Sequence, residues 1–458
     1  MEDLPPPLLS DILSRLSSST DLGRCRLVSR TLRSLTPTVR SVRFLCSRAR
    51  YLRSRDPSTR SSTVPFKSVV ETAISTHFAE GFLESVFVGV EEPLRGGGDG
   101  GLEEEDGWDE EEVEAEDLYL TGVDFVGRVV AAVGGRLTSM EIVDFWMQSC
   151  WRRSGALAAV AVHCDKLLNL EIKNAWLTVE GLKPMPNLTN LKLEHIRLDD
   201  EDLKGINDCF PSLQVLHLID VGGLKEPRIH LQQLKILHWT VSNAPLSLTI
   251  NTPELTKLNL KCIKPKNFIL RAPSLSQLTL KVEKLNGFVE VQNFTCLKSL
   301  KVASSDIQNI SRLLDGRTID NVAVESSLSG KWSIENMVSF DAVASSFPEV
   351  NAMEFGPWIL LEMQHHFKCL GPSAGMCELK KLKRLTIYLK LKVYIPFLRH
   401  MIKNCQALSN VEVFIHVDVP AHEGSDVISR FMVKFPRIKW KLGLWSGSHA
   451  EALFGDMF

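Results

Sequence analysis

The chain has no run of eighteen consecutive apolar residues, and its N-terminus has no basic segment followed by an apolar one. The first absence gives no support for a transmembrane helix, and the second excludes the usual form of a secretory signal. The ten cysteines include no Cys-x-x-Cys pair and no regular spacing. In a chain of 458 residues this favours reduced thiols over a disulfide framework. We therefore expect a protein of the cytoplasm or nucleus with no membrane partner.

The sequence also lacks the signatures of common active sites. There is no Gly-x-Ser-x-Gly or His-Glu-x-x-His motif, and the glycine-rich "GGGDGG" at 96–101 lacks the Lys-Ser/Thr of a phosphate-binding loop. The segment "HHFKC" at 365–369 with Cys377 brings histidine and cysteine together, but its spacing fits no structural zinc site and a second ligand pair is missing. We expect no enzyme, no cofactor and no metal site.

Acidic residues are concentrated in one segment. Residues 91–117 hold 14 acidic residues and one arginine, with many glycines. Such a composition cannot bury enough apolar surface to become ordered, so we predict a disordered acidic loop at 91–117. Two roles remain open, solubility and electrostatic cover for basic surface elsewhere in the chain.

A repeat organises most of the chain. The pattern L-x-x-L-x-L recurs, with conservative replacements, at intervals of 20 to 25 residues between 167 and 324: "LLNLEI" (167–172), "LTNLKL" (188–193), "LQVLHL" (213–218), "LKILHW" (234–239), "LTKLNL" (255–260), "LSQLTL" (275–280), "LKSLKV" (297–302) and "IDNVAV" (319–324). Weaker copies begin at 39, 83, 137, 350, 382, 408 and 435. Because no single unit can bury its apolar face alone, the units are expected to stack.

Each repeat contains a short strand of alternating pattern, with its fourth and sixth positions in the core and its third and fifth on a concave solvent face. These repeats resemble the leucine-rich repeat family over residues 39–440, which implies a solenoid lined by a curved parallel sheet. One feature departs from that family. The Asn or Cys expected after the last anchor is replaced, for example by Ala175, Ile196 and Val221, so we expect no side-chain ladder there.

Repeat length predicts what lies on the convex side. Units of 20–22 residues leave little room for a helix, so extended or 3₁₀ segments are expected through 230–300. Longer units allow real helices, which we expect in 197–210 and 395–406.

Residues 4–35 have two apolar stripes at helical spacing, separated by a Ser/Thr turn. We expect Asp21 to cap the second helix, with Leu22, Cys25, Val28 and Leu32 along one face. The segment resembles the F-box, a three-helix motif that docks on a Skp-type adaptor. The resemblance implies an adaptor-binding set of Leu4, Pro5, Leu8, Leu9, Ile12, Leu13, Leu16, Leu22, Cys25, Val28 and Leu32.

Some F-box positions differ here. Pro7 replaces a usual acidic residue, Ser17 a usual proline and Leu32 a common tryptophan, and the turn between the helices is about one residue longer. None of these changes removes the apolar stripe. The other interpretation is that the helices only cap the solenoid. About 35 residues are too few to bury both apolar stripes internally. If the segment is an F-box, part of an apolar face stays open for a partner; if it is only a cap, the solenoid covers that face.

Polar side chains are expected along the concave face, where lysines collect toward residues 257–301. The candidate target-binding residues are Lys192, His217, His238, Lys257, Asn259, Lys261, Lys281 and Lys301. A basic face favours an acidic or phosphorylated protein segment, and the alternative is an ordinary solvated surface. The Arg-rich run at 24–60 has few aromatics for base stacking, among them Tyr51, so no nucleic acid partner is expected.

The sequence therefore predicts an α/β protein with an F-box at 1–38 and an irregular leucine-rich-repeat solenoid at 39–458, whose regular core is 160–330. By resemblance it is a plant-type substrate receptor of a Skp–cullin–F-box ubiquitin ligase, with an adaptor, a cullin and an unknown target as partners. The alternative is a leucine-rich-repeat binding scaffold outside any ligase.

Overall fold

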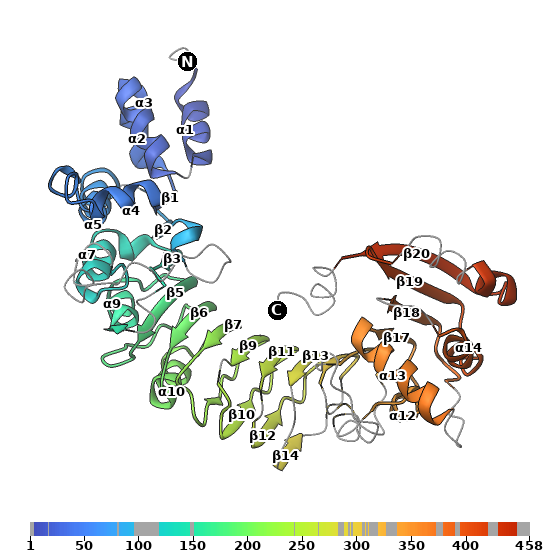
Figure 1. The fold of residues 1–458 in the computed structure, drawn as a ribbon. Coiled ribbons are helices and arrows are strands. Elements are labelled where there is room, and N and C mark those ends of the chain that lie inside the picture. Colours follow the sequence, from blue (N-terminus) through green and yellow to red (C-terminus); the bar gives the residue numbers. More distant parts are fainter. Residues whose placement is uncertain are drawn as a thin grey trace. The chain divides into compact units, whose positions relative to one another are not determined.

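The computed structural model describes residues 4–16, 18–79, 82–95, 119–146, 151–241, 243–263, 265–282, 288–291, 294, 296–304, 307, 310, 319–326, 337–371, 379–389, 394–419 and 429–446. The chain divides into two compact units, Met1–Leu234 and Lys235–Phe458 (Figure 1). Within the described ranges, no helix has the length and apolarity needed to cross a bilayer.

Parallel strands run through both units, and the described residues hold a sheet of sixteen strands. In the first unit the order is β1 (Ser41–Cys46), β2 (Ser85–Val90), β3 (Ser139–Val143), β5 (Asn169–Leu177), β6 (Asn190–Arg197) and β7 (Val215–Val221), with β4 (Arg153–Ser154) pairing β5. In the second unit it is β9 (Ile236–Val241), β11 (Lys257–Cys262), β13 (Gln277–Val282), β15 (Ser299–Ala303), β16 (Asn321–Glu325), β17 (Ala352–Phe355), β18 (Arg384–Leu389), β19 (Asn410–His416) and β20 (Lys439–Trp445).

Every predicted repeat, weak copies included, supplies one of these strands, so the predicted parallel-sheet solenoid is confirmed. The repeat around β6 shows why. Leu188, Leu191 and Leu193 are all buried, and Leu191 pairs in register with Leu170 on one side and Leu216 on the other. Each anchor therefore lies against the same anchor of the neighbouring repeats, and the stack forms a continuous apolar core.

The other side of the sheet carries helices where the repeats are long. In the first unit these are α4 (Arg48–Arg55), α5 (Phe66–Ala73) with a π-helical end at Ile74–Phe78, α7 (Val123–Val133), α9 (Ala156–His163) and α10 (Asp200–Cys209). In the second they are α12 (Phe340–Ser346), α13 (Pro357–Leu370) and α14 (Ile395–Lys403). The helices expected in 197–210 and 395–406 are thus confirmed. A capping box between Asp199 and Asp202 begins α10.

Short repeats carry strands there instead of helices. In the second unit β10 (Ser247–Asn251), β12 (Asn267–Arg271) and β14 (Phe288–Val291) pair in parallel, and the first unit has β8 (Arg228–Ile229). This confirms the extended segments expected through 230–300, because units of this length have too few residues for a helix.

The N-terminal residues form three helices, α1 (Pro6–Arg15), α2 (Ser19–Val28) and α3 (Arg30–Leu35). The cap of α2 is Ser18, whose Oγ accepts from the N–H of Asp21, so the expected Asp21 cap is wrong. Ser29 caps α3, so the segment forms two helices, and the apolar stripe that we expected along one helix from Leu22 to Leu32 is divided between them. As a result, Leu22 and Leu32 are buried while Val28 faces solvent.

The predicted disordered loop at 91–117 begins too early. Residues 91–95 carry a 3₁₀ turn (Glu92–Leu94), Leu94 is buried, and Glu91 Oε2 accepts from the N–H of Arg48 at 2.7 Å. The remaining part, 96–117, lies outside the described residues.

One member of the polar ladder that we expected to be missing is present, one residue earlier in the repeat. Ala175, Ile196 and Val221 are buried, but the residues just before them are Asn174, His195 and Asp220, all with positive φ. At the first repeat Asn174 Nδ2 donates to the carbonyl oxygens of Arg95 (3.0 Å) and Asp144 (2.8 Å). The expectation was therefore wrong at this repeat: a displaced asparagine satisfies the loop backbone.

Candidate functional site

The three N-terminal helices leave apolar side chains open to solvent. On α1, Leu8 is 52% exposed and Ile12 is 39% exposed, one helical turn apart. At the end of α2, Leu27 is 89% exposed and Val28 is 82% exposed. We call these four residues the F-box apolar face. Removing such apolar side chains from water by burying them against a partner lowers the free energy of the complex. The F-box apolar face is therefore a candidate docking surface.

The predicted adaptor-binding set divides into two groups. Leu9, Leu13, Leu22 and Leu32 lie in the core between the helices, where they hold the helices in place. Leu4, Pro5, Leu8, Ile12 and Val28 are exposed, and Leu16 and Cys25 are half-buried. Only the exposed and half-buried members can touch another protein directly without unfolding the helices.

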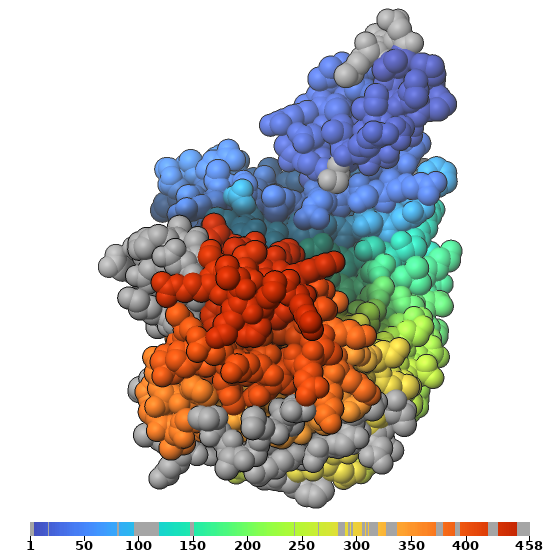
Figure 2. Space-filling view, turned by 90° about the vertical axis from the view of Figure 1, so that its right-hand side faces the viewer, coloured from blue at the N-terminus to red at the C-terminus, as the bar shows by residue number. Residues whose placement is uncertain are grey.

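These helices are attached to the rest of the first unit at one end. Ser10 Oγ lies 2.9 Å from Thr38 Oγ1, and Ser18 forms a β-bridge with Arg43 of β1. Figure 2 shows the helices as a protruding knob, dark blue, standing out from the end of the first unit on the face in view. The interpretation that they only cap the solenoid does not explain this open surface.

Lys192, a predicted target-binding residue, belongs to an ion-pair ladder on the concave face of the first unit. Its Nζ lies 2.6 Å from Glu171 Oε1 and 3.1 Å from Glu194 Oε2, and Lys173 Nζ lies 2.6 Å from Glu194 Oε1. Burial opposes the charge on Glu194, but hydrogen bonds from the two lysines hold its pKa below the ordinary value. The two lysines and two glutamates of this ladder therefore balance one another's charge.

A cavity of about 230 Å³ opens on the same concave face. Glu141, Lys192 and the predicted residue His217 line it. Burial, reinforced by the nearby Glu171, raises the pKa of Glu141. The first unit therefore offers a concave surface of mixed charge; the basic patch that the sequence predicted, at residues 257–301, lies in the second unit.

The remaining predicted residues lie in the second unit, on neighbouring strands. Lys261 and Lys281 are direct cross-strand partners on β11 and β13, and Lys301 pairs with Thr279. Lys257 is exposed on the same sheet, Asn259 is half-buried beside it, and His238 is buried. The structure thus brings Lys261 and Lys281 together as a basic pair and withdraws His238 from the surface.

The histidine and cysteine cluster was not expected to bind metal. His365 Nδ1 lies 3.6 Å from Cys369 Sγ on the exposed side of α13, one turn apart, and Cys377 falls outside the described residues. Among the ranges that the structure describes, no group of three or more potential ligands converges on one point.

A three-helix N-terminal module with an open apolar face, followed by a leucine-rich-repeat solenoid, defines an F-box protein of the leucine-rich-repeat class. Sequence comparison agrees. A family profile described as "F-box-like" matches residues 1–43, and one described as "FBD-associated F-box protein At5g56370, LRR repeats" matches residues 136–280.

The chain is also similar along its length to F-box/LRR-repeat protein At4g29420 of Arabidopsis thaliana. The two are 40% identical over 453 residues, which cover 97% of this chain and 98% of the relative. The chain therefore belongs to the F-box/LRR-repeat family, and a role in substrate recognition accords with that membership.

Sequence reasoning missed two features of these surfaces. Leu27 was not placed in the adaptor-binding set, although it is the most exposed large apolar side chain of the F-box helices. The pairing of Lys192 with two glutamates was also missed. The sequence pattern indicated this pairing. Glu171 occupies the position equivalent to Lys192 in the preceding repeat, and Glu194 lies two residues after Lys192 on the same strand.

Proposed function

We propose that this chain is the substrate-recognition subunit of a Skp–cullin–F-box ubiquitin ligase of the cytoplasm or nucleus. The F-box apolar face binds the Skp-type adaptor, and through it the cullin, while the repeats bind a target protein. The observation that carries this proposal is the exposure of Leu8, Ile12, Leu27 and Val28 on helices that already have a complete internal core.

The energetics support a stable complex. Burying a large aliphatic side chain contributes roughly 1.5–3 kcal/mol, so four such residues supply a large gross stabilisation, before the costs of association are subtracted. In the ligase this chain carries no catalytic residue. It raises the local concentration of the target near the ubiquitin-charged enzyme, which turns a bimolecular encounter into a positioned one.

The test is co-purification of the full chain with a Skp-type adaptor. Leu8→Asp together with Ile12→Asp places two charges on the F-box apolar face and is expected to abolish adaptor binding. The matched control, Leu246→Asp with Val417→Asp, makes the same change at two exposed positions of the second unit and is expected to bind normally.

Two outcomes contradict the proposal. One is retained adaptor binding by Leu8→Asp/Ile12→Asp at the level of the control. The other is an unaltered chain that elutes apart from the adaptor, which would make the protein a leucine-rich-repeat scaffold outside a ligase.

A further inference from the structure

The concave cavity of the first unit lies between two rows of side chains that run across β3, β5, β6 and β7 at paired positions. The neutral row consists of Ser139, Asn169, Asn190 and Val215. The charged row, two residues further along each strand, consists of Glu141, Glu171, Lys192 and His217. At about 230 Å³ the cavity is smaller than the roughly 300–1,000 Å³ of most small-molecule pockets. Its size therefore suits a single long side chain.

Two carboxylates lie side by side in the charged row. Glu141 on β3 and Glu171 on β5 are direct cross-strand partners, and adjacent strands are only about 4.8 Å apart. Like charges at paired positions repel each other, so this arrangement lowers the stability of the sheet. Lys192 already balances Glu171 within the ion-pair ladder, with Nζ 2.6 Å from Oε1. Glu141 is therefore the additional carboxylate of the cavity.

The charge of Glu141 is only partly balanced by the chain itself. Arg43 Nη1 lies 3.9 Å from Glu141 Oε2, which is beyond hydrogen-bond distance. The Arg43 guanidinium lies over the Phe87 ring, with Cζ 3.8 Å from the ring centre. Burial and then the charge of Glu171 raise the pKa of Glu141, although the neighbouring cations act in the opposite direction. A further cation in the cavity would stabilise Glu141 as a carboxylate.

We propose that this cavity binds an arginine side chain of the target protein. The inference rests on the proposed function, because it assigns a chemical class to the segment that the repeats recognise. A guanidinium presents five N–H donors in a planar fork, so it can contact Glu141 and Glu171 together. The side-chain oxygens of the neutral row are further acceptors beside it. The ammonium of lysine is a compact, strongly hydrated charge and matches two neighbouring carboxylates less well.

The experiment measures binding of three fluorescent peptide pools to the full chain co-expressed with its adaptor. The pools share degenerate flanks and carry a fixed central arginine, lysine or glutamine. The parent chain is expected to bind the arginine pool most tightly. Glu141→Gln keeps the size of the side chain and removes its charge. It is expected to weaken binding of the arginine pool by about tenfold and to leave the glutamine pool unchanged.

Lys192→Gln provides a second variant whose effect has the opposite sign. It removes the cation next to Glu171, so it is expected to strengthen binding of the arginine pool by about threefold. Damage to the fold would weaken binding of every pool. A gain in this variant therefore separates an effect of charge from an effect of structure.

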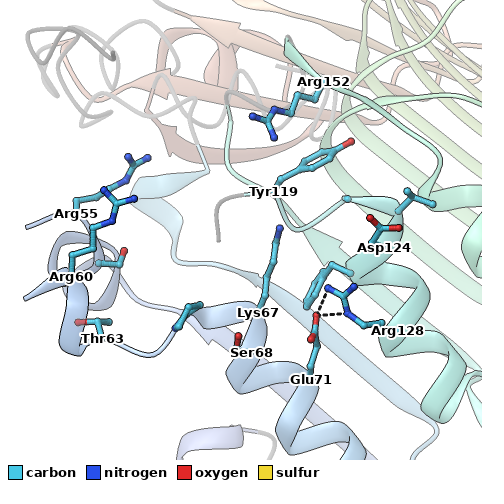
Figure 3. Close-up of a pocket in the computed structure, with 15 residues that line it drawn as sticks. Arg55, Arg60, Thr63, Lys67, Ser68, Glu71, Tyr119, Asp124, Arg128 and Arg152 are labelled. Atoms are coloured by element: carbon cyan, nitrogen blue, oxygen red, sulfur yellow. Dashed lines mark hydrogen bonds and ion pairs between the residues drawn. The ribbon is translucent and has the colours of Figure 1, made fainter. Parts of the chain in front are cut away.

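The matched control is Asp124→Asn. Asp124 is exposed at the start of α7, on the wall of a separate cavity of about 610 Å³ that the end of α4, α5 and α7 form on the helical side of the first unit (Figure 3). The control removes the same charge from a cavity wall of the same unit, outside the concave face. It is expected to bind all three pools as the parent does.

Equal binding of the arginine and glutamine pools overturns the proposal, as does full binding of the arginine pool by Glu141→Gln. A lysine pool bound as tightly as the arginine pool overturns the assignment to a guanidinium. Adaptor co-purification is scored on every variant. A chain that binds the adaptor without preferring arginine contradicts this inference alone, whereas an unaltered chain that does not bind the adaptor contradicts the proposed function.

Discussion

His195 and Asp220 occupy equivalent positions in successive repeats, and both have left-handed backbone conformations, with φ of 52° and 51°. His195 Nδ1 lies 3.6 Å from Asp220 Oδ2, and the Trp146 ring packs edge-on against the imidazole at 5.0 Å. Left-handed backbone costs energy in any residue with a Cβ. Among the described residues, three successive repeats therefore have a strained backbone near the end of the strand, at Asn174, His195 and Asp220, and each strained residue is polar.

The strain at this corner is testable at Asp220. We expect Asp220→Gly to be about 1 kcal/mol more stable than Asp220→Ala, because both lose the carboxylate but only alanine keeps the Cβ penalty. Thermal unfolding of the two variants side by side measures the difference. Equal stability of the two would mean that the backbone at Asp220 carries no strain.

Gly223 follows the same corner and has φ of +92°. A Cβ there would stand 2.4 Å from the carbonyl oxygen of Leu198, so Gly223→Ala is expected to destabilise the first unit by about 1–3 kcal/mol. Gly127→Ala in α7 is the matched control. A Cβ at Gly127 meets nothing within 4 Å, and alanine there is expected to stabilise the helix by about 0.5–1 kcal/mol. Denaturation midpoints that move in the same direction for both variants would contradict this account.

A pH dependence is expected from Glu325, at the end of β16. Its Oε1 accepts from the N–H groups of Ser326 (2.7 Å) and Ile359 (2.9 Å), the latter in the first turn of α13. Burial raises the pKa of this carboxyl from 4.5 to about 7, against the effect of these hydrogen bonds. The folded state thus holds the proton more tightly than the unfolded state does. The contribution of this carboxyl group to the free energy of unfolding is therefore fully present below about pH 4.5, and it is lost as the pH rises through about 7.

Glu325→Gln keeps an acceptor oxygen and removes the ionisation. We expect the variant to match the parent near pH 4 and to exceed it near pH 8 by at most about 3 kcal/mol. Hydrogen exchange of α13 amides, corrected for intrinsic rates, measures this locally. Glu349→Gln, at an exposed carboxylate of the same unit, is the control and should leave the pH slope unchanged. A parent and a Glu325→Gln variant with parallel pH profiles would rule out Glu325 as the source.

Much of the fold was predictable because the repeat is a local signal. Leu188, Leu191 and Leu193 occupy fixed offsets, and strands that alternate in this way must bury the same face in every copy. The boundaries of helices were less accessible. Both Ser18 and Asp21 suit an N-cap, and the choice of Ser18 depends on the path of the chain into α2.

The sequence by itself determined the parallel solenoid, the helices of the long repeats and the resemblance of the N-terminal residues to an F-box. Only tertiary structure decided which F-box leucines form the core and which remain open, since Leu9 and Leu8 are chemically identical neighbours that differ only in the direction they face. Likewise, Arg55, Lys67 and Arg152 come from segments nearly a hundred residues apart and share one cavity. Periodicity reports local burial, whereas the convergence of distant side chains depends on how the repeats stack.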